Sequence, residues 1–172
     1  MKLFSIYSSI IYALILSSSC RQAERGTLDY GLLTFDTNRV AIFQWDTTKY
    51  VFPNNSDPLA LTQGDLSIVD SLLQNAIDSF NAISSPRFYL SFNKVVPLDS
   101  FTIDPTKYKI QFFPYKDVNG QRIVSINGFN DNFPTWKNEV YADRLHFGIH
   151  KFELKVNLSD TTHGDIQTGS YG

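Results

Sequence analysis

The residues best suited to metal chemistry are two histidines four positions apart, His146 and His150. On a helix this spacing would place both imidazoles on one face, but the surrounding residues alternate as in a strand. Four residues of strand rise about 13 Å, too far for both rings to bind one ion at about 2 Å each unless the chain bends at Gly148. His163 lies in a polar stretch and is expected to face solvent. We therefore predict no metal site.

Nucleophilic and hydrolytic chemistry have equally few signals. The chain has no Gly-x-Ser-x-Gly motif and no glycine-rich phosphate loop, and its serines cluster in turns, where local hydrogen bonding explains them. Two carboxylates of a glycoside hydrolase could still meet in space. The candidates are Asp99, Asp104, Glu139, Asp143 and Glu153. Nothing selects a pair among them, so we predict no catalytic residues and no cofactor.

The single cysteine, Cys20, follows a segment typical of a bacterial signal peptide. Lys2 supplies a positive start, residues 3–16 form an apolar run that is short for a membrane span, and three serines precede the cysteine. We expect lipid attachment at Cys20 after removal of residues 1–19. The alternatives are a secretory signal in which Cys20 is incidental and an uncleaved anchor helix. A lone cysteine also excludes an intramolecular disulfide.

Aromatic residues, 15% of the chain, are the remaining lead. Some of them lie beside a predicted hairpin and in the loop after it, where they could form an exposed apolar patch. Rigid aromatic surface binds a peptide or a carbohydrate at low entropic cost. At least half of these residues are expected to belong to the core. The candidate binding surface consists of Phe113, Tyr115, Phe129, Phe133 and Trp136.

One long amphipathic helix is predicted ahead of these residues. Thr62 is a suitable N-cap, and Asp65 is placed to complete a capping box. Across residues 66–80 apolar side chains recur at spacings of three and four, which indicates one apolar stripe on about five helical turns. Four polar residues are expected on its solvent side: Asp70, Gln74, Asn75 and Asp78.

The helix is expected to end at residues 81–85, where Pro86 should stop it. Residues 87–93 could then form an edge strand or a loop packed over a sheet. Before the helix, residues 39–45 are almost continuously apolar, which favours a strand buried on both faces.

The strongest hairpin signal spans Tyr108 to Phe129, where two aromatic and β-branched runs flank the turn at residues 117–120. Even-numbered residues of the first arm should share one face and odd-numbered residues the other. Pro114 cannot donate a ladder hydrogen bond, so it indicates an edge, a bulge or a strand end. In residues 140–158 the apolar phase shifts between Ile149 and Phe152, which predicts a β-bulge or a turn. The tail, residues 159–172, is either strand or disorder.

These elements predict one α+β domain over residues 35–172, held by a tether of residues 20–34. Its architecture is one long amphipathic helix packed on a curved antiparallel sheet of four or more strands. The element order is similar to that of cystatin-like folds, an analogy of shape alone. A formal net charge of −2 without a basic cluster argues against nucleic acid as a partner.

Several segments resemble, in order and spacing, a group of small uncharacterised lipoproteins of Bacteroidota-type bacteria. They read V-A-I-F-Q-W-D, L-T-Q-G-D-L, K-Y-K-I-Q-F-F-P, W-K-N-E-V and F-E-L-K-V-N-L and cover residues 39–158. Members of that group often carry cysteines after the hairpin and a Gly-Gly turn before the last long strand, both absent here. The resemblance implies a lipoprotein and no particular activity.

Three functional hypotheses follow. The first is a lipid-anchored protein of the bacterial cell envelope, periplasmic or surface-exposed, which binds or scaffolds another envelope protein or a glycan without catalysis. Its contact surface would be the hairpin and the loop after it, and the acyl chain would hold it to the membrane. The second is a carbohydrate-binding or small-ligand module that uses the concave sheet face. The third is an envelope hydrolase.

Overall fold

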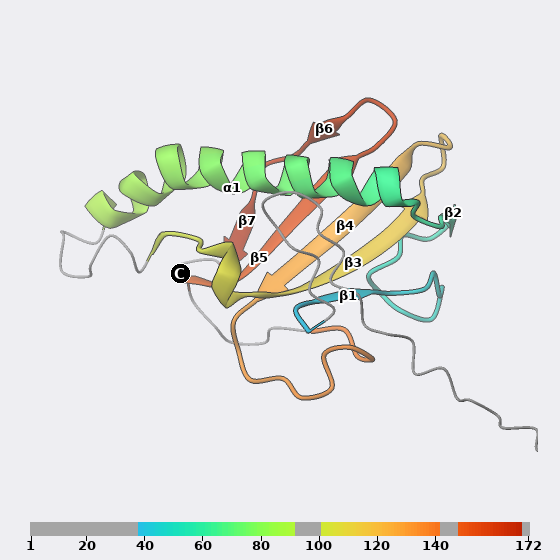
Figure 1. The fold of residues 1–172 in the computed structure, drawn as a ribbon, viewed down its shortest axis with the longest axis horizontal. Helices are drawn as coiled ribbons and strands as arrows, with labels where there is room; N and C mark the ends of the chain where they lie inside the picture. Colours follow the sequence, from blue (N-terminus) through green and yellow to red (C-terminus); the bar gives the residue numbers. More distant parts are fainter. Residues whose placement is uncertain (1–37, 92–100, 142–147, 170–172) are drawn as a thin grey trace, which may run out of the picture.

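The computed structural model describes residues 38–91, 101–141 and 148–169. They form one long helix, α1 (Gln63–Ser91), which lies across one face of an open, mixed sheet of seven strands (Figure 1). The α+β prediction is therefore confirmed. The predicted signal peptide, Cys20 and the tether lie outside the described residues. In chain order the other elements are β1 (Val40–Ile42), β2 (Asp57–Pro58), the 3-10 helix η2 (Pro105–Lys107), β3 (Lys109–Lys116), β4 (Arg122–Phe129), β5 (Gly148–Asn157), β6 (Thr162–His163) and β7 (Gln167–Gly169).

The centre of the sheet is antiparallel, as predicted, and consists of β3, β4 and β5. β1 is parallel to β3, with Val40 opposite Ile110, and this pairing makes the sheet mixed. β2 also pairs with β3, while β6 and β7 both pair with β5. The predicted strand at residues 39–45 is reduced to three residues. Ile42 is 44% exposed, so burial on both faces was wrong for this short strand at the sheet edge.

The predicted hairpin is confirmed, and its turn is held by one carboxylate. Asp117 Oδ1 accepts hydrogen bonds from the backbone nitrogens of Asn119 at 2.9 Å and Gln121 at 2.8 Å. Gly120 has φ +75°, a conformation that glycine adopts without a steric penalty. This turn sets the β3–β4 register, from Lys116 opposite Arg122 at the turn to the far end of both strands.

Pro114 lies in the middle of β3. On the side where its N–H donor is missing, no described strand pairs with this residue. The backbone of Ile110 and of Phe112 bonds toward β1, so even-numbered residues of β3 turn their polar groups to that side. β1 pairs with β3 as far as Phe112, and β2 pairs with β3 at Tyr115 and Lys116. Pro114 therefore removes no hydrogen bond from the β3–β4 ladder, in keeping with the predicted edge position.

The capping box at the start of α1 is confirmed. Thr62 donates its backbone N–H to Asp65 Oδ2 at 2.8 Å, and Asp65 donates its own to Thr62 Oγ1 at 3.2 Å. Arg122 Nη2 lies 2.6 Å from the same carboxylate oxygen, which ties the helix to the start of β4. Burial alone would raise the pKa of Asp65, but the hydrogen bonds from Thr62 and Arg122 and the charge of Arg122 hold that pKa below its usual 3.8.

The helix continues through Pro86 to Ser91, so the predicted stop was wrong, as were both alternatives for residues 87–91. Its later turns are anchored by tertiary contacts. Asn81 donates to the carbonyl of Ile103 and accepts from its N–H, both at 2.9 Å. Ser85 is buried, with its hydroxyl 3.4 Å from that of Thr102. These contacts offset the missing hydrogen bond of one proline. Within the described ranges, no helix is long and apolar enough to cross a bilayer.

The sheet separates two hydrophobic cores. The larger lies between α1 and the even-numbered side chains of β3 and β4, as the alternation predicted. Gly128 belongs to this face, where a Cβ would lie 2.2 Å from the ring of Phe152. Asp70, expected on the solvent side of α1, is buried at 5% exposure. The second core lies on the opposite face.

The phase shift in β5 is a β-bulge or irregularity within one continuous strand. Its register with β7 shifts between Gly148 and Phe152, and both Ile149 and Phe152 contact the core beneath α1. A turn at this point, the other alternative, is therefore wrong. In the tail, β6 and β7 confirm strand at residues 162–163 and 167–169.

Replacing Asp65 by Asn should lower the free energy of unfolding by about 1 to 2 kcal/mol at neutral pH, through loss of the cap and of the Arg122 ion pair. Because the pKa of Asp65 is depressed in the folded state, its contribution is present above pH 3.8 and is lost as pH falls through the folded value. Urea unfolding at neutral pH and at a pH below the folded pKa of Asp65 should therefore show the two proteins converging in acid. Asp78→Asn, an exposed change on the same helix, is the control and should cost less.

Candidate functional site

The predicted aromatic surface is mostly a buried core. Phe113, Tyr115, Phe129 and Trp136 are only 0 to 5% exposed, and Phe133 is half-buried. As an exposed patch this prediction was wrong, because residues 130–141, hereafter the covering loop, fold over the odd-numbered face of β3 and β4. Within it Tyr141 stacks on Phe129, with ring centroids 4.2 Å apart.

A fully buried amide joins the covering loop to the sheet. Gln111 Nε2 donates to the carbonyls of Trp136 at 2.6 Å and Glu139 at 2.7 Å, and Gln111 Oε1 accepts from the N–H of Tyr141 at 3.0 Å. Buried backbone groups need partners, and one side chain here supplies three of them.

Gln111 begins a row of polar side chains that runs across the sheet. Asn127 on β4 is its register partner, Glu153 on β5 is opposite Asn127, and Gln167 on β7 is opposite Glu153. We call these four residues the polar row. Their sequence neighbours Phe112, Ile126, Phe152 and Leu154 belong to the core beneath α1, so the polar row faces away from the helix.

Asn127 lies where the polar row passes from the buried core to the pocket. Its Nδ2 donates to the carbonyl of Tyr141 at 3.0 Å and lies 3.5 Å from Gln111 Oε1. This donor bond fixes the orientation of the amide. Asn127 is 6% exposed, and its Oδ1 has no hydrogen-bond partner. A buried acceptor left in this state costs about 1–3 kcal/mol.

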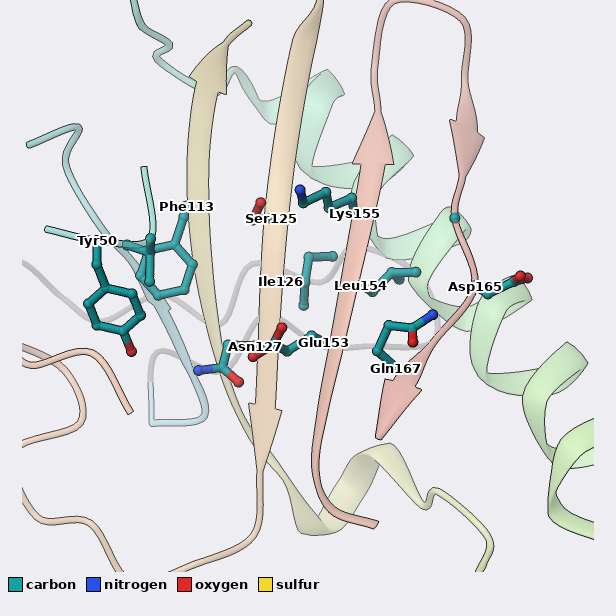
Figure 2. Close-up of a pocket in the computed structure, with 12 residues that line it drawn as sticks. Tyr50, Phe113, Ser125, Ile126, Asn127, Glu153, Leu154, Lys155, Asp165 and Gln167 are labelled. Atoms are coloured by element: carbon teal, nitrogen blue, oxygen red, sulfur yellow. The ribbon is translucent and has the colours of Figure 1, made fainter. Parts of the chain in front are cut away.

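A pocket of about 520 Å³ lies over this part of the sheet. Figure 2 shows Ser125, Asn127, Glu153 and Lys155 along its floor, with Tyr50 and Phe113 on one side and Asp165 and Gln167 on the other. Its volume is within the range of small-molecule sites, roughly 300–1,000 Å³. Of the five predicted aromatic residues, Phe113 borders it.

The charges around the pocket nearly cancel. Lys151 Nζ lies 2.7 Å from Glu153 Oε1, and the exposed Lys155 and Asp165 supply one further charge of each sign. The pocket therefore offers hydrogen-bond donors and acceptors without a strong field of either sign.

The predicted carboxylates mostly have structural partners. Asp104 caps η2, and hydrogen bonds from Thr106 hold its pKa below the usual value. Glu139 accepts from the hydroxyl of Thr135 at 2.8 Å. Glu153 alone of the described candidates lines the pocket, together with Asp165, which the sequence analysis missed. Asp99 and Asp143 lie outside the described residues.

The two described histidines, His150 and His163, do not come together in a site. His150 Nδ1 lies 3.1 Å from Asn130 Oδ1, His163 is exposed, and His146 lies outside the described residues. Across residues 38–91, 101–141 and 148–169, no group of three or more His, Cys, Asp or Glu side chains is arranged to hold a metal ion.

Comparison of the chain with protein-family models, curated proteins and solved structures finds no match. One part of the polar row, the pairing of Asn127 with Gln111, could have been predicted from the sequence. Ser125 and Asn127 alternate with apolar residues on the return arm of the hairpin, and the turn sets Asn127 opposite Gln111.

Gln111→Leu should destabilise the protein by about 2 kcal/mol or more, because two backbone carbonyls and one N–H lose their buried partner. Gln121→Leu is the matched control. Gln121 is exposed beside the same hairpin turn, so this change should cost no more than about 0.5 kcal/mol. Equal midpoints of chemical unfolding for the two variants would contradict the structural role of Gln111.

Proposed function

We propose that this protein is a lipid-anchored, non-catalytic binding domain of the bacterial cell envelope, with its ligand site in the pocket on the sheet face away from α1. The observation that carries the proposal is the pocket with its exposed polar side chains, those of Glu153, Lys155 and Gln167. Asn127 also lines it, with its amide oriented by Tyr141 and its Oδ1 buried without a hydrogen-bond partner in the described part of the chain. A few polar groups of this kind on the floor of a pocket fix the orientation of a bound small ligand.

The pocket favours a small ligand over the macromolecular contact surface that the sequence placed on the hairpin and covering loop. Four of the five aromatic side chains chosen for that surface are buried, so they stabilise the fold and are not available to a partner. The polar row, in contrast, ends in the exposed side chains of Glu153 and Gln167.

Binding fits the pocket better than hydrolysis. A glycosidic general acid is typically tuned by an apolar, enclosed site. The side chain of Glu153 is instead 61% exposed and paired with Lys151. Such a carboxylate is suited to accepting hydrogen bonds from a ligand.

A thermal-shift screen of the purified full-length lipoprotein, in a detergent without a sugar headgroup, tests the site. The panel contains amino acids, nucleosides, carboxylic acids and uncharged sugars. At least one class should raise the melting temperature of the wild type by mass action, and this rise should disappear in the Glu153→Ala, Gln167→Ala variant. Asp78→Ala, on the far side of the sheet, should respond as the wild type does. A screen in which no compound acts through the pocket would refute the site.

The anchor is tested separately by Cys20→Ser. The apolar run at residues 3–16 and the lone cysteine after it support an acyl chain at Cys20. The variant should lose incorporation of a labelled fatty acid and leave the envelope membrane fraction on cell fractionation, because the chain supplies the membrane affinity. Unchanged labelling and unchanged fractionation would contradict lipidation at this residue.

A further inference from the structure

We infer that the ligand of this pocket is an uncharged saccharide, which stacks on Tyr50 and hydrogen-bonds through its hydroxyls to Glu153 and Lys155. This inference rests on the proposed function, since it names the ligand class of the same pocket. It combines three independent observations: the hydrogen-bonding character of the floor, its charge, and the exposed ring at its side.

The floor accepts hydrogen bonds at one point and donates them at the next. Asn127 and Glu153 are directly opposite each other on adjacent strands, so their Cβ atoms lie about 5 Å apart. The carboxylate of Glu153 is 61% exposed and, when ionised, only accepts hydrogen bonds, while Asn127 Oδ1 is buried beside it.

The adjacent pair is Ser125 opposite Lys155, two residues or about 7 Å along the strands. Lys155 only donates, and Ser125 both donates and accepts. A ligand that bridges these pairs must carry hydrogen-bond donors near Glu153 and acceptors near Lys155. Neighbouring hydroxyls on a sugar ring meet this demand.

The charge of the lining selects an uncharged ligand. Glu153 is already neutralised by Lys151 at 2.7 Å, and Lys155 and Asp165 oppose each other in sign. A phosphate or carboxylate ligand would need a surplus of cationic groups, and an amine would need a surplus of anionic ones. The pocket lining has neither.

Tyr50 supplies an aromatic platform beside these polar groups. It is 72% exposed, whereas the other aromatic side chains whose burial the structure describes are buried or half-buried. The negative face of such a ring attracts the weakly positive C–H groups of a sugar.

The turn that carries Tyr50 is firmly held, which fixes the backbone position from which the ring projects. Lys49 N donates to the carbonyl of Asp46 at 3.0 Å, and Phe52 N donates to that of Lys49 at 3.1 Å. Phe52 is buried and packs edge-on against Phe113, with centroids 6.0 Å apart. An exposed aromatic ring on an anchored turn loses little conformational entropy when a ligand binds.

Titration calorimetry and saturation-transfer NMR on the full-length lipoprotein, in the same detergent, test this inference. The probes are uncharged mono- to tetrasaccharides of glucose, galactose, mannose and N-acetylglucosamine, with glucuronate and glucosamine as charged counterparts. At least one uncharged saccharide should bind, and its charged counterpart should bind more weakly.

Variants at exposed positions then locate the contact without threatening the fold. Tyr50→Ala should weaken saccharide binding roughly 2- to 10-fold, while Tyr50→Phe, which keeps the ring, should retain it. Glu153→Ala should weaken binding about tenfold or more. Val118→Ala, at the exposed tip of the hairpin, is the control and should bind as the wild type does.

The possible failures are distinguishable. If no uncharged saccharide binds but another class in the thermal-shift screen binds through Glu153 and Gln167, the saccharide inference is overturned and the proposed function stands. Saccharide binding that survives both Tyr50→Ala and Glu153→Ala would overturn the inferred contact. If nothing binds in the pocket by either method, both fail.

Discussion

The side of the sheet away from α1 depends on the buried amide of Gln111. This one side chain satisfies three backbone groups of the covering loop, and the loop in turn closes the second core over Phe129 and Trp136. The same loop presents the carbonyl of Tyr141 to Asn127 Nδ2. The hydrogen bonds that bury the aromatic residues therefore also orient the amide of Asn127 at the edge of the pocket.

The polar row runs from this buried network to the pocket. Gln111 hydrogen-bonds to the backbone through both Nε2 and Oε1, and Asn127 does so through Nδ2. Glu153 and Gln167 extend into the pocket. The side chains of the polar row pass from buried to exposed along the row, because each register partner lies one strand further from the covering loop. The helix covers the opposite face and leaves this one available.

Local signals predicted the fold well. The capping box at Thr62 and Asp65, the hairpin turn and the phase shift before Phe152 each depend on neighbouring residues, and each was confirmed. The errors arose where distant contacts decide. α1 continues beyond Pro86 because the side chain of Asn81 hydrogen-bonds to the backbone of Ile103, which is distant in the sequence. The aromatic residues are buried because the covering loop returns to Gln111. The pocket combines a turn, the three central strands and the tail, a combination that pattern reading of separate segments could not bring together.

The most direct test of the account is a map of where a saccharide touches the protein. We would record amide chemical shifts of the isotopically labelled full-length protein, including the side-chain amides of Asn127 and Gln167, with and without the uncharged saccharide that binds best. The account predicts shifts concentrated at Tyr50, Glu153, Lys155 and Gln167, with the Gln167 side chain among the largest. Shifts confined to α1 or to the hairpin tip, with Glu153 and Gln167 unchanged, would contradict it.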